Sequence, residues 1–495
     1  MPDNINYLYR YRSLSSPFVF KELENLEIYF AKPNELNDQM EDYMNIVWQG
    51  DEIAFQGLFK HYLYTLSHLY YIASLVNRGE HLDIEHLPIF MSTDLLKAPE
   101  MKTIFKDIYF EFFSSESIAN IPTKMANSNK KFTADEILLI LKSIHMYAYL
   151  VINTQIKKHI RGEDSLAEKE YNEIYNSVKY WQSYDIIINT LISEQYKKEF
   201  LLSLIDSQDM QREQIKIGLD KTHSSKDNFN INVLTFDYPE LYIKQIKKIL
   251  YNNFCVTCFS ATYRNEPMWS HYADSENGIC LKFKVKNKDN SNYINLYTVT
   301  GITSDSKGTR VNKGYYDNPI YKVKYADEYP EIDFFSSLGC LPHPIIDGFW
   351  LCNYDQTKFS NCREKYKNMD EWRKNYHKKA EEYICTKAKS WKYEQEYRIF
   401  QREMMHPTYD DVENRIAKYN LEDLEAIIFG RNVSANDKQR IIEIVNKQRK
   451  EKSLTGLKFY DLYYSTITKQ LEIKKCREYA TVLANEAMTL YKQNI

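Results

Sequence analysis

The order of two kinds of sequence pattern constrains the fold of this chain more than any other feature. Alternating, strand-like segments occupy residues 1–50 and return after residue 250. Between them, about 200 residues, a length at the upper end of domain size, carry apolar side chains at helical spacing. No glycine occurs from residue 163 to residue 217, which favours continuous helices. Two sheet-forming halves separated in this way predict one α+β domain that is split by a large helical insertion.

The chain has 495 residues, more than a single ordinary core accommodates, so several domains are expected. We place the first part of the α+β domain at residues 1–50, an all-helical insertion at 51–250, the second part at 251–474 and a C-terminal helix at 475–495. The α+β domain is expected to contain a small mixed or antiparallel sheet. In the insertion, a capping box from Thr133 to Glu136 precedes the apolar run 137–152 and predicts a long helix.

Charge and hydropathy argue against several classes of protein. Lys and Arg number 65 and Asp and Glu 68, so no overall charge favours nucleic acid or a membrane surface. The lysine pairs of the helical region are scattered, which indicates a solvated surface, with nucleic-acid contact as the less favoured alternative. The run 137–152 contains Lys142 and His145 and is too short to span a bilayer. The amino-terminal segment lacks the pattern of a secretion signal, so we expect a cytoplasmic protein.

All eight cysteines follow residue 254, and Cys255 and Cys258 form a C-x-x-C pair. On a strand, residues three apart point to opposite faces. The pair therefore predicts buried thiols in a reducing compartment rather than a redox or metal site. The other cysteines lack zinc-site spacing, so no metal site is predicted from them.

The most informative charged segment is Tyr393–Phe400. If it is a strand, alternation places Glu394, Glu396 and Arg398 on one face, opposite aromatic and apolar side chains. Burying such charges is unfavourable unless they pair or bind a ligand. Two interpretations stay open here: a functional site, or a structural ion pair between Glu396 and Arg398.

Other segments of the two sheet-forming halves have recognisable patterns. We expect a strand at Tyr7–Arg12 with Leu8, Arg10 and Arg12 on one face, and a helix that starts at Asn265-Glu266-Pro267. Further strands are predicted at 254–260, 279–285, 424–429 and 457–464, with helices at 379–389 and 435–449. The polar segment 287–316 is expected to be a long irregular excursion.

Six of these pieces, in this order, resemble one bacterial family of unknown biochemical function that is related to AbiGi-type abortive-infection proteins. They are Tyr11-Arg12-Ser13-Leu14, Asn37-Asp38-Gln39-Met40-Glu41, Phe259-Ser260, Met268 to Asp274, Trp391 to Arg398 and Ile428-Phe429-Gly430. The resemblance covers the split α+β domain only. It implies a bacterial origin and a role in defence against phage.

A second resemblance concerns mechanism. Mono-ADP-ribosyltransferases of the Arg-Ser-Glu type carry an arginine on their first strand, a Ser-Thr-Ser-like strand and a later Glu-x-Glu. This chain is similar in offering Arg10 or Arg12, then Ser260-Ala261-Thr262, then Glu394-Gln395-Glu396. It departs from the pattern at Ala261 and Thr262, which puts the middle element in doubt. The resemblance implies NAD as the cofactor.

That resemblance also implies roles for individual residues. Glu396 would stabilise the oxocarbenium-like state and hold the ribose 2′-hydroxyl, as in glycoside cleavage. Glu394 would orient or deprotonate the acceptor. An arginine such as Arg12 would bind the pyrophosphate through two hydrogen bonds.

Further residues complete the expected site. Ser260 would fix the nicotinamide ribose or the sheet geometry, and Tyr263 or Trp269 would stack on the nicotinamide ring. His271 is a candidate proton donor, with a hydrogen-bonded structural histidine as the alternative. Helical spacing also allows Trp269 to be a core residue, together with Tyr272. The cofactor-binding candidates are Arg10, Arg12, Ser260, Thr262, Tyr263, Trp269 and Arg398.

Two other functions remain open. Asp38 and Glu41, together with Glu394 and Glu396, have the ligand chemistry of a divalent-metal nuclease. Alternatively, the chain is a non-catalytic protein that binds a phage component. Through its helical insertion we expect it to contact a protein target, a phage trigger or a second copy of itself. Convergence of distant residues such as Arg12, Ser260 and His271 on one cleft with Glu396 would favour a functional site.

Overall fold

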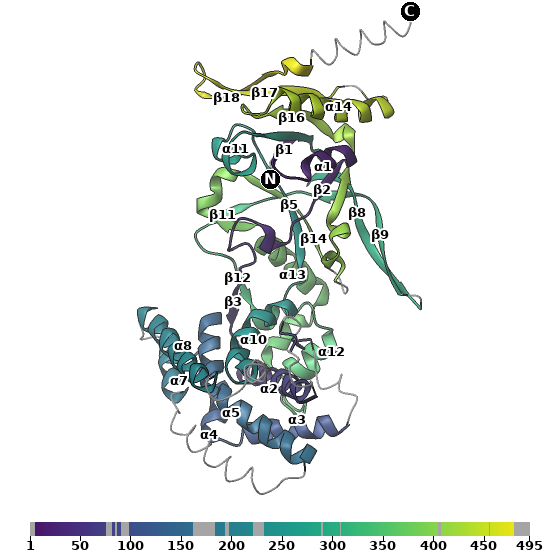
Figure 1. The fold of residues 1–495 in the computed structure, drawn as a ribbon. Helices are drawn as coiled ribbons and strands as arrows, with labels where there is room; N and C mark the ends of the chain where they lie inside the picture. The colour runs from purple at the N-terminus through teal and green to yellow at the C-terminus, as the bar shows by residue number, and fades with distance from the viewer. Residues whose placement is uncertain are drawn as a thin grey trace, which may run out of the picture. The chain divides into compact units, whose positions relative to one another are not determined.

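The computed structural model describes residues 5–75, 82–84, 87–90, 99–161, 184–193, 198–220, 232–288, 291–306, 308–403, 407–454 and 456–479. The protein has an α+β fold, as predicted, and its chain forms two compact units (Figure 1). The first unit comprises Met1–Tyr43, Asn253–Tyr329 and Glu381–Ile495. The second comprises Met44–Asn252 and Pro330–Ala380.

The first unit is built on an eight-stranded sheet. Its strands, in spatial order, are β10 (Tyr321–Lys322), β14 (Glu396–Arg402), β5 (Phe254–Ser260), β1 (Tyr7–Ser13), β6 (Gly278–Lys284), β16 (Leu424–Phe429), β17 (Lys458–Ser465) and β18 (Gln470–Lys475). Neighbouring strands are antiparallel except β16 and β17, which are parallel. The sheet is therefore mixed, as predicted, but larger than expected.

Side chains alternate along β1 and contribute to two different cores. Leu8 packs in the larger core together with Phe283 of β6 and Ile399 of β14. Tyr11 faces the other side of the sheet, where its ring lies edge-on to Trp269. The face of β1 that was predicted to carry Leu8, Arg10 and Arg12 is therefore the face on the side of the larger core.

A second sheet of the first unit contains a long ribbon. The order of its strands is β2 (Glu27–Tyr29), β15 (Ile416–Tyr419), β8 (Ser291–Asp305) and β7 (Lys286–Lys288), and β9 (Gly308–Pro319) pairs with β8. Figure 1 shows β8 and β9 projecting from the unit. The irregular excursion predicted over 287–316 is therefore wrong. Aromatic and β-branched residues such as Tyr297 and Val299 favour strands even in a polar segment.

Three helices and a two-stranded sheet complete the first unit. The helices are α1 (Val19–Asn25), α11 (Glu266–Tyr272) and α14 (Ala435–Glu451), and β11 (Lys324–Ala326) pairs with β13 (Thr386–Ala388). Asn265 caps α11 as predicted, because its side chain accepts a hydrogen bond from the backbone N–H of Met268. The helix expected over 379–389 is the end of α13 (Met369–Ile384), and Lys387 lies instead on β13.

The second unit is mainly helical. Its helices are α2 (Glu52–Leu75), α3 (Pro99–Phe112), α4 (Glu116–Asn127), α5 (Ala134–Arg161), α7 (Tyr184–Ser193), α8 (Lys198–Asp220), α10 (Tyr238–Ile246) and α12 (His343–Ile345), and α13 begins there. The predicted capping box precedes α5, since Thr133 N–H donates to Glu136 Oε2 and Glu136 N–H donates to Thr133 Oγ1.

Two features of the second unit differ from the prediction. It is not all-helical, because β12 (Glu331–Asp333), β3 (Asn45–Trp48) and β4 (Phe132–Thr133) form a three-stranded sheet. It also includes Pro330–Ala380, which we had assigned to the α+β domain. The close approach of Gly57 to Trp350 shows why: a Cβ on Gly57 would lie 2.0 Å from the Trp350 carbonyl oxygen.

A neutral polar network lies in the core of the second unit. His61 Nε2 is 2.9 Å from the Ile89 carbonyl oxygen, and Nδ1 is 2.8 Å from the Tyr242 hydroxyl. His145 repeats the arrangement on α5, with Nδ1 2.7 Å from the Tyr62 hydroxyl and Nε2 on a backbone carbonyl. A carbonyl only accepts, so each Nε2 donates and each Nδ1 accepts from a tyrosine. Burial lowers the pKa of both histidines to about 3.

One helical segment in the described part of the chain, Ala134–His159, is long and apolar enough to cross a membrane. Of its most apolar window, 61% is buried within the protein, as in the core helix of a soluble protein. The expected C-terminal helix at 475–495 lies outside the described residues from residue 480 onwards.

Candidate functional site

The central sheet of the first unit opens between β1 and β5. These strands pair through Tyr9 opposite Ser260, whereas β1 pairs with β6 along its whole length. Nearer the start of β5, its edge pairs with Ala31 instead of β1. Ala31 and Val256 exchange two backbone hydrogen bonds of 2.8 Å. The opening between the strands creates space for a ligand.

A cavity of about 410 Å³ occupies this opening, a size within the range of small-molecule sites. Its walls contain Arg12 of β1, Ser260 of β5, His271 of α11 and Glu396 of β14. The four residues whose convergence we identified as informative therefore line one cavity. Five of the six segments that carry the first family resemblance contribute residues to it, the exception being Ile428-Phe429-Gly430.

Arg10 brings a positive charge to this cavity without an ion-pair partner among the described residues. Its Nη1 donates to Thr257 Oγ1 and to the Cys258 carbonyl oxygen at 3.3 Å, and its Nη2 donates to the Tyr29 carbonyl oxygen at 3.3 Å. All three acceptors are neutral, and no carboxylate in the described part of the chain forms an ion pair with it. Burial and then the neighbouring charge of Arg12 lower the pKa of Arg10 to about 10, so the guanidinium stays protonated at neutral pH.

Arg12 is differently engaged. Its Nε and Nη2 donate to the two carboxylate oxygens of Glu22, at 2.8 and 2.5 Å. Glu22 therefore occupies the two guanidinium donors of Arg12 that were predicted to bind a pyrophosphate. Arg12 lines the cavity, but of the two arginines Arg10 has the charge free for an anion.

The acidic wall differs from the predicted continuous strand. Lys389–Glu394 is a 3₁₀ helix, Gln395 has a left-handed backbone with φ 46°, and β14 begins only at Glu396. The turn is held to β5, because Ser260 Oγ donates to the Glu394 carbonyl oxygen at 2.8 Å and Ala261 N–H donates to that of Gln395. Glu394 nevertheless lines the cavity with Glu396 and Arg398.

Glu396 is the most strongly paired carboxylate of this wall. Arg398 donates to it twice, from Nε at 2.7 Å and from Nη2 at 3.1 Å, and Lys387 Nζ lies 3.4 Å away. Burial alone would raise the pKa of Glu396, but Arg398 and Lys387 outweigh it and lower the value to about 2. The structural pairing considered from the sequence is therefore present, and it keeps Glu396 ionised.

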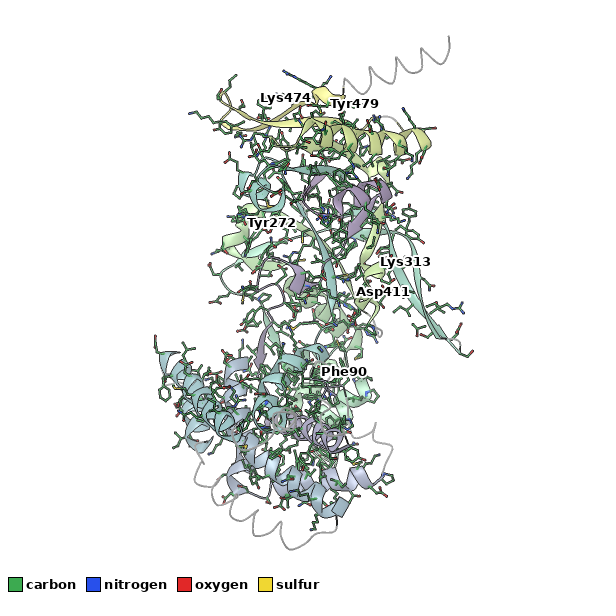
Figure 2. The ribbon with its side chains drawn as sticks, in the orientation of Figure 1. Phe90, Tyr272, Lys313, Asp411, Lys474 and Tyr479 are labelled. Atoms are coloured by element: carbon green, nitrogen blue, oxygen red, sulfur yellow. The ribbon has the colours of Figure 1, made fainter. Side chains whose placement is uncertain are left out.

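Glu394 and Glu41 behave in the opposite way. Glu394 accepts from Lys387 Nζ at 2.7 Å and from the Tyr272 hydroxyl, which extends from α11 (Figure 2). Glu41 accepts from Arg398 and lies 4.0 Å from Lys387. Burial raises the pKa of both carboxyls, against the attraction of these cations. We call Glu41, Glu394, Glu396, Lys387 and Arg398 the charge cluster; its three carboxylates face two cations.

Three predicted cofactor-binding residues lie outside the cavity lining. Trp269 is fully buried and packs on Tyr11, so its ring faces the core and not a ligand. Tyr263 packs against Tyr9, with ring centres 5.5 Å apart and ring planes tilted by 57°. Thr262 shapes the loop, because its carbonyl oxygen accepts from the Tyr11 hydroxyl at 2.9 Å. Tyr263, Trp269 and Thr262 are therefore separated from the other predicted site residues, which line the cavity.

His271 and Ser260 both line the cavity, but they differ in exposure and in hydrogen bonding. His271 is exposed, and its ring centre lies 6.3 Å from that of Tyr393. Ser260 is buried and its hydroxyl hydrogen is committed to Glu394. Of the two uses expected for Ser260, fixing the sheet geometry is the one that its hydrogen bond serves.

The four carboxylates of the nuclease alternative do not share one empty space. Glu41, Glu394 and Glu396 line the cavity, whereas Asp38 does not and instead accepts from the backbone N–H of Met40. Lys387 Nζ contacts the other three. A lysine ammonium thus holds the position between the carboxylates that a divalent cation would need.

Cys255 is buried and Cys258 is half-buried, and both lie on the predicted strand, β5. All eight are free thiols, Cys255 packs in the larger core and Cys258 lines the cavity, so the pair points to opposite faces. One group in the described part of the chain has metal-ligand spacing. It consists of Asp461, Cys476 and Glu478, and Lys438 Nζ already lies 2.8 Å from Asp461.

Two residues of the cavity wall, Lys387 and Tyr272, are not among the site residues predicted from the sequence. Lys387 was assigned to a helix, although its neighbours Thr386 and Ala388 give a short alternating segment. Tyr272 was assigned to the core by helical spacing, yet it lines the cavity and binds Glu394. An excess of acidic residues in the Glu-x-Glu segment was the available signal that buried cations must lie nearby.

Comparison with known families identifies part of this chain. A family model described as a protein of unknown function, DUF2971, matches residues 268–399. Those residues therefore form a DUF2971 domain. The DUF2971 domain includes His271, Lys387, Glu394, Glu396 and Arg398, whereas the arginines of β1 lie outside it. No curated protein and no solved structure was found to match the chain.

Proposed function

We propose that the cavity binds NAD and that the protein transfers or releases ADP-ribose. The observation that carries this proposal is the opposite charge of the two walls. Arg10, without a carboxylate partner, lines the same cavity as a cluster in which three carboxylates face two cations. NAD has a matching pair of charges, an anionic pyrophosphate and a cationic nicotinamide ring.

The pKa directions suit the roles of the two glutamates. In the proposed reaction the bond between ribose C1′ and the nicotinamide nitrogen breaks, and its electron pair leaves with neutral nicotinamide. Glu396, which stays ionised, supports the positive charge that develops on the ribose. An oxygen or nitrogen of the acceptor then bonds to C1′, and its proton passes to Glu394, whose raised pKa favours proton uptake.

The biological part of the proposal is a cytoplasmic bacterial effector that acts against phage. It is supported by the resemblance to AbiGi-related proteins, since segments that carry it also line the cavity. The DUF2971 match gives no reaction of its own.

The first experiment incubates the purified protein with NAD, with and without phage lysate, and measures nicotinamide release. We expect release by the natural protein and a loss of about 100-fold or more in Glu396→Gln, as for other groups that stabilise transition-state charge. Glu382→Gln is the matched control, because Glu382 pairs only loosely with Lys324 and lies outside the cavity lining. It should keep full turnover.

Two results would overturn the proposal. One is the absence of both NAD binding and NAD consumption in the natural protein under either condition. The other is magnesium-dependent degradation of DNA or RNA that survives Arg12→Ala but not Asp38→Ala, which would favour the nuclease. Thermal unfolding of each variant must accompany these assays, because Glu396 is buried among charges.

A further inference from the structure

The two carboxylate oxygens of Glu41 have different surroundings. Oε1 is bound by Arg398 Nη1, whereas Oε2 has no hydrogen-bond partner among the described residues. The Glu41 side chain is only 3% exposed and lines the cavity. A buried carboxylate oxygen without a donor is unfavourable, so its retention at the wall of a cavity points to a ligand.

The protein donors around Glu41 do not reach Oε2. Lys387 Nζ donates to Glu394 at 2.7 Å and to Glu396 at 3.4 Å, and it forms an ion pair with Glu41 Oε2 at 4.0 Å, beyond hydrogen-bond distance. Arg398 uses Nη1 on Glu41 Oε1 and on the Ile384 carbonyl oxygen, and its other donors on Glu396. A donor for Oε2 is therefore to be sought on the ligand.

The charges of the cavity select the kind of donor. A phosphate would be repelled by the three carboxylates, and an ammonium group would lie beside Lys387 and Arg398, which repel it in turn. A neutral hydroxyl avoids both conflicts and forms a short, charge-assisted hydrogen bond with a carboxylate. Within the proposed ligand, the ribose hydroxyls are such groups.

We propose that Glu41 Oε2 accepts a hydrogen bond from a ribose hydroxyl of the bound dinucleotide. This inference rests on the proposed function and adds a residue that determines specificity from outside the Glu394-Gln395-Glu396 segment. Glu41 thereby makes the site selective for ribose over deoxyribose. Either ribose of NAD supplies the same chemistry, so the test includes both.

The test is a double-mutant-type cycle in which Glu41 is substituted in the protein and one hydroxyl is removed from the ligand. Calorimetry measures the Kd of NAD and of analogues that lack one hydroxyl at the 2′ or 3′ position of either ribose. For the natural protein, we expect one analogue to bind at least about tenfold more weakly than NAD, as is typical of a hydrogen bond to a charged group. In Glu41→Gln this ratio should fall to about threefold or less, as for a neutral partner.

Glu35→Gln is the matched control. Glu35 also lines the cavity, but its oxygens are already held by Arg415 and by the Tyr29 hydroxyl. This variant removes the same charge without freeing or removing an acceptor for the ligand. It should change the affinity for NAD and its analogues alike and leave the ratio unchanged.

The outcomes separate this inference from the function on which it rests. If the natural protein binds NAD and every analogue equally, or if the ratio persists in Glu41→Gln, Glu41 is not the hydroxyl acceptor although NAD binding stands. If the natural protein does not bind NAD, the proposed function itself fails, and this inference with it. Should Glu41→Gln not fold, Glu41→Asp withdraws the carboxylate by one methylene group and should reduce the ratio in the same way.

Discussion

The two units bury polar side chains in contrasting ways. In the first, five charged residues form a cluster beside a cavity, and one carboxylate oxygen of Glu41 has no hydrogen-bond partner among the described residues. In the second, two histidines stay neutral, and every ring nitrogen has a partner among tyrosines and backbone carbonyls. The charge cluster therefore leaves one buried acceptor unsatisfied, whereas every ring nitrogen of the neutral network is satisfied.

This contrast teaches where to look for function. Histidine in a buried helical core attracts attention as a candidate catalyst, yet His61 and His145 have no free nitrogen and a pKa of about 3. The glutamates of the first unit resemble a structural ion-pair lattice, yet they border the cavity. In the described part of the chain, buried atoms without a hydrogen-bond partner occur in both units, so the informative feature is a buried carboxylate oxygen without a donor at the wall of a cavity.

The largest effect should come from removing one cation of the cluster. Lys387→Met leaves three buried carboxylates with a single cation, and breaking a buried ion pair in this way costs about 3–5 kcal/mol. Chemical denaturation of the first unit measures the loss. Lys389→Met is the control, because the Lys389–Asp327 pair is exposed and such pairs contribute about 0–1 kcal/mol. Equal, small losses in both variants would mean that the cluster is not a coupled unit.

Lowering the pH should change the stability of the two units differently: the second unit should lose stability and the first should not. Below pH 6.5 the two histidines are protonated in the unfolded chain, whereas His61 and His145 stay neutral in the folded protein. The stability that is present above pH 6.5 is therefore lost as the pH falls towards 3. The loss is about 1.4 kcal/mol per pH unit for each histidine, or about 2 kcal/mol each by pH 5.

Between pH 7 and pH 5 the first unit should not weaken, because the stability contributed by the lowered pKa of Glu396 is lost only below the unfolded value near 4.5. Glu41 and Glu394 have raised pKa values, so the folded form takes up protons before the unfolded chain does. Amide hydrogen exchange at pH 7 and pH 5, corrected for intrinsic rates, should therefore show α2 and α5 opening more readily while β5 and β14 do not. Parallel changes in both units would contradict the comparison.

The smallest effect should come from opening the neutral network by one hydrogen bond. Tyr62→Phe removes the hydroxyl that donates to His145 Nδ1 and should cost about 1–2 kcal/mol in denaturant unfolding, because the ring nitrogen is left buried without a donor. A change near zero would show that the network tolerates an unsatisfied atom after all. The incomplete cluster of the first unit would then lose its significance as a sign of function.

Local patterns predicted much of the fold. The alternation of Ile279 to Val285, the cap at Asn265 and the box at Thr133 each depend on neighbouring residues, and each was confirmed. The failures depend on contacts between distant segments. Nothing local reveals that Gln395 adopts a left-handed backbone because the turn is held to β5.

The same limit applies to the candidate site. Arg10 and Arg12 share a strand and a face, and only the neighbouring Glu22 distinguishes the paired arginine from the free one. Glu41 and Lys387 lie nearly 350 residues apart, a separation at which spacing carries no information. The residues of the cluster were largely visible in the sequence, but their pairing was not.

The opening between β1 and β5 has a consequence for synthesis on the ribosome. Arg10 is translated before the second unit, whereas Glu396 and Arg398 are added only after the whole second unit has been translated. Truncated chains that end before β13 therefore carry Arg10 but only Glu41 of the charge cluster. For a protein whose chemistry would consume a metabolite of the cell that makes it, this order of synthesis withholds activity from incomplete chains.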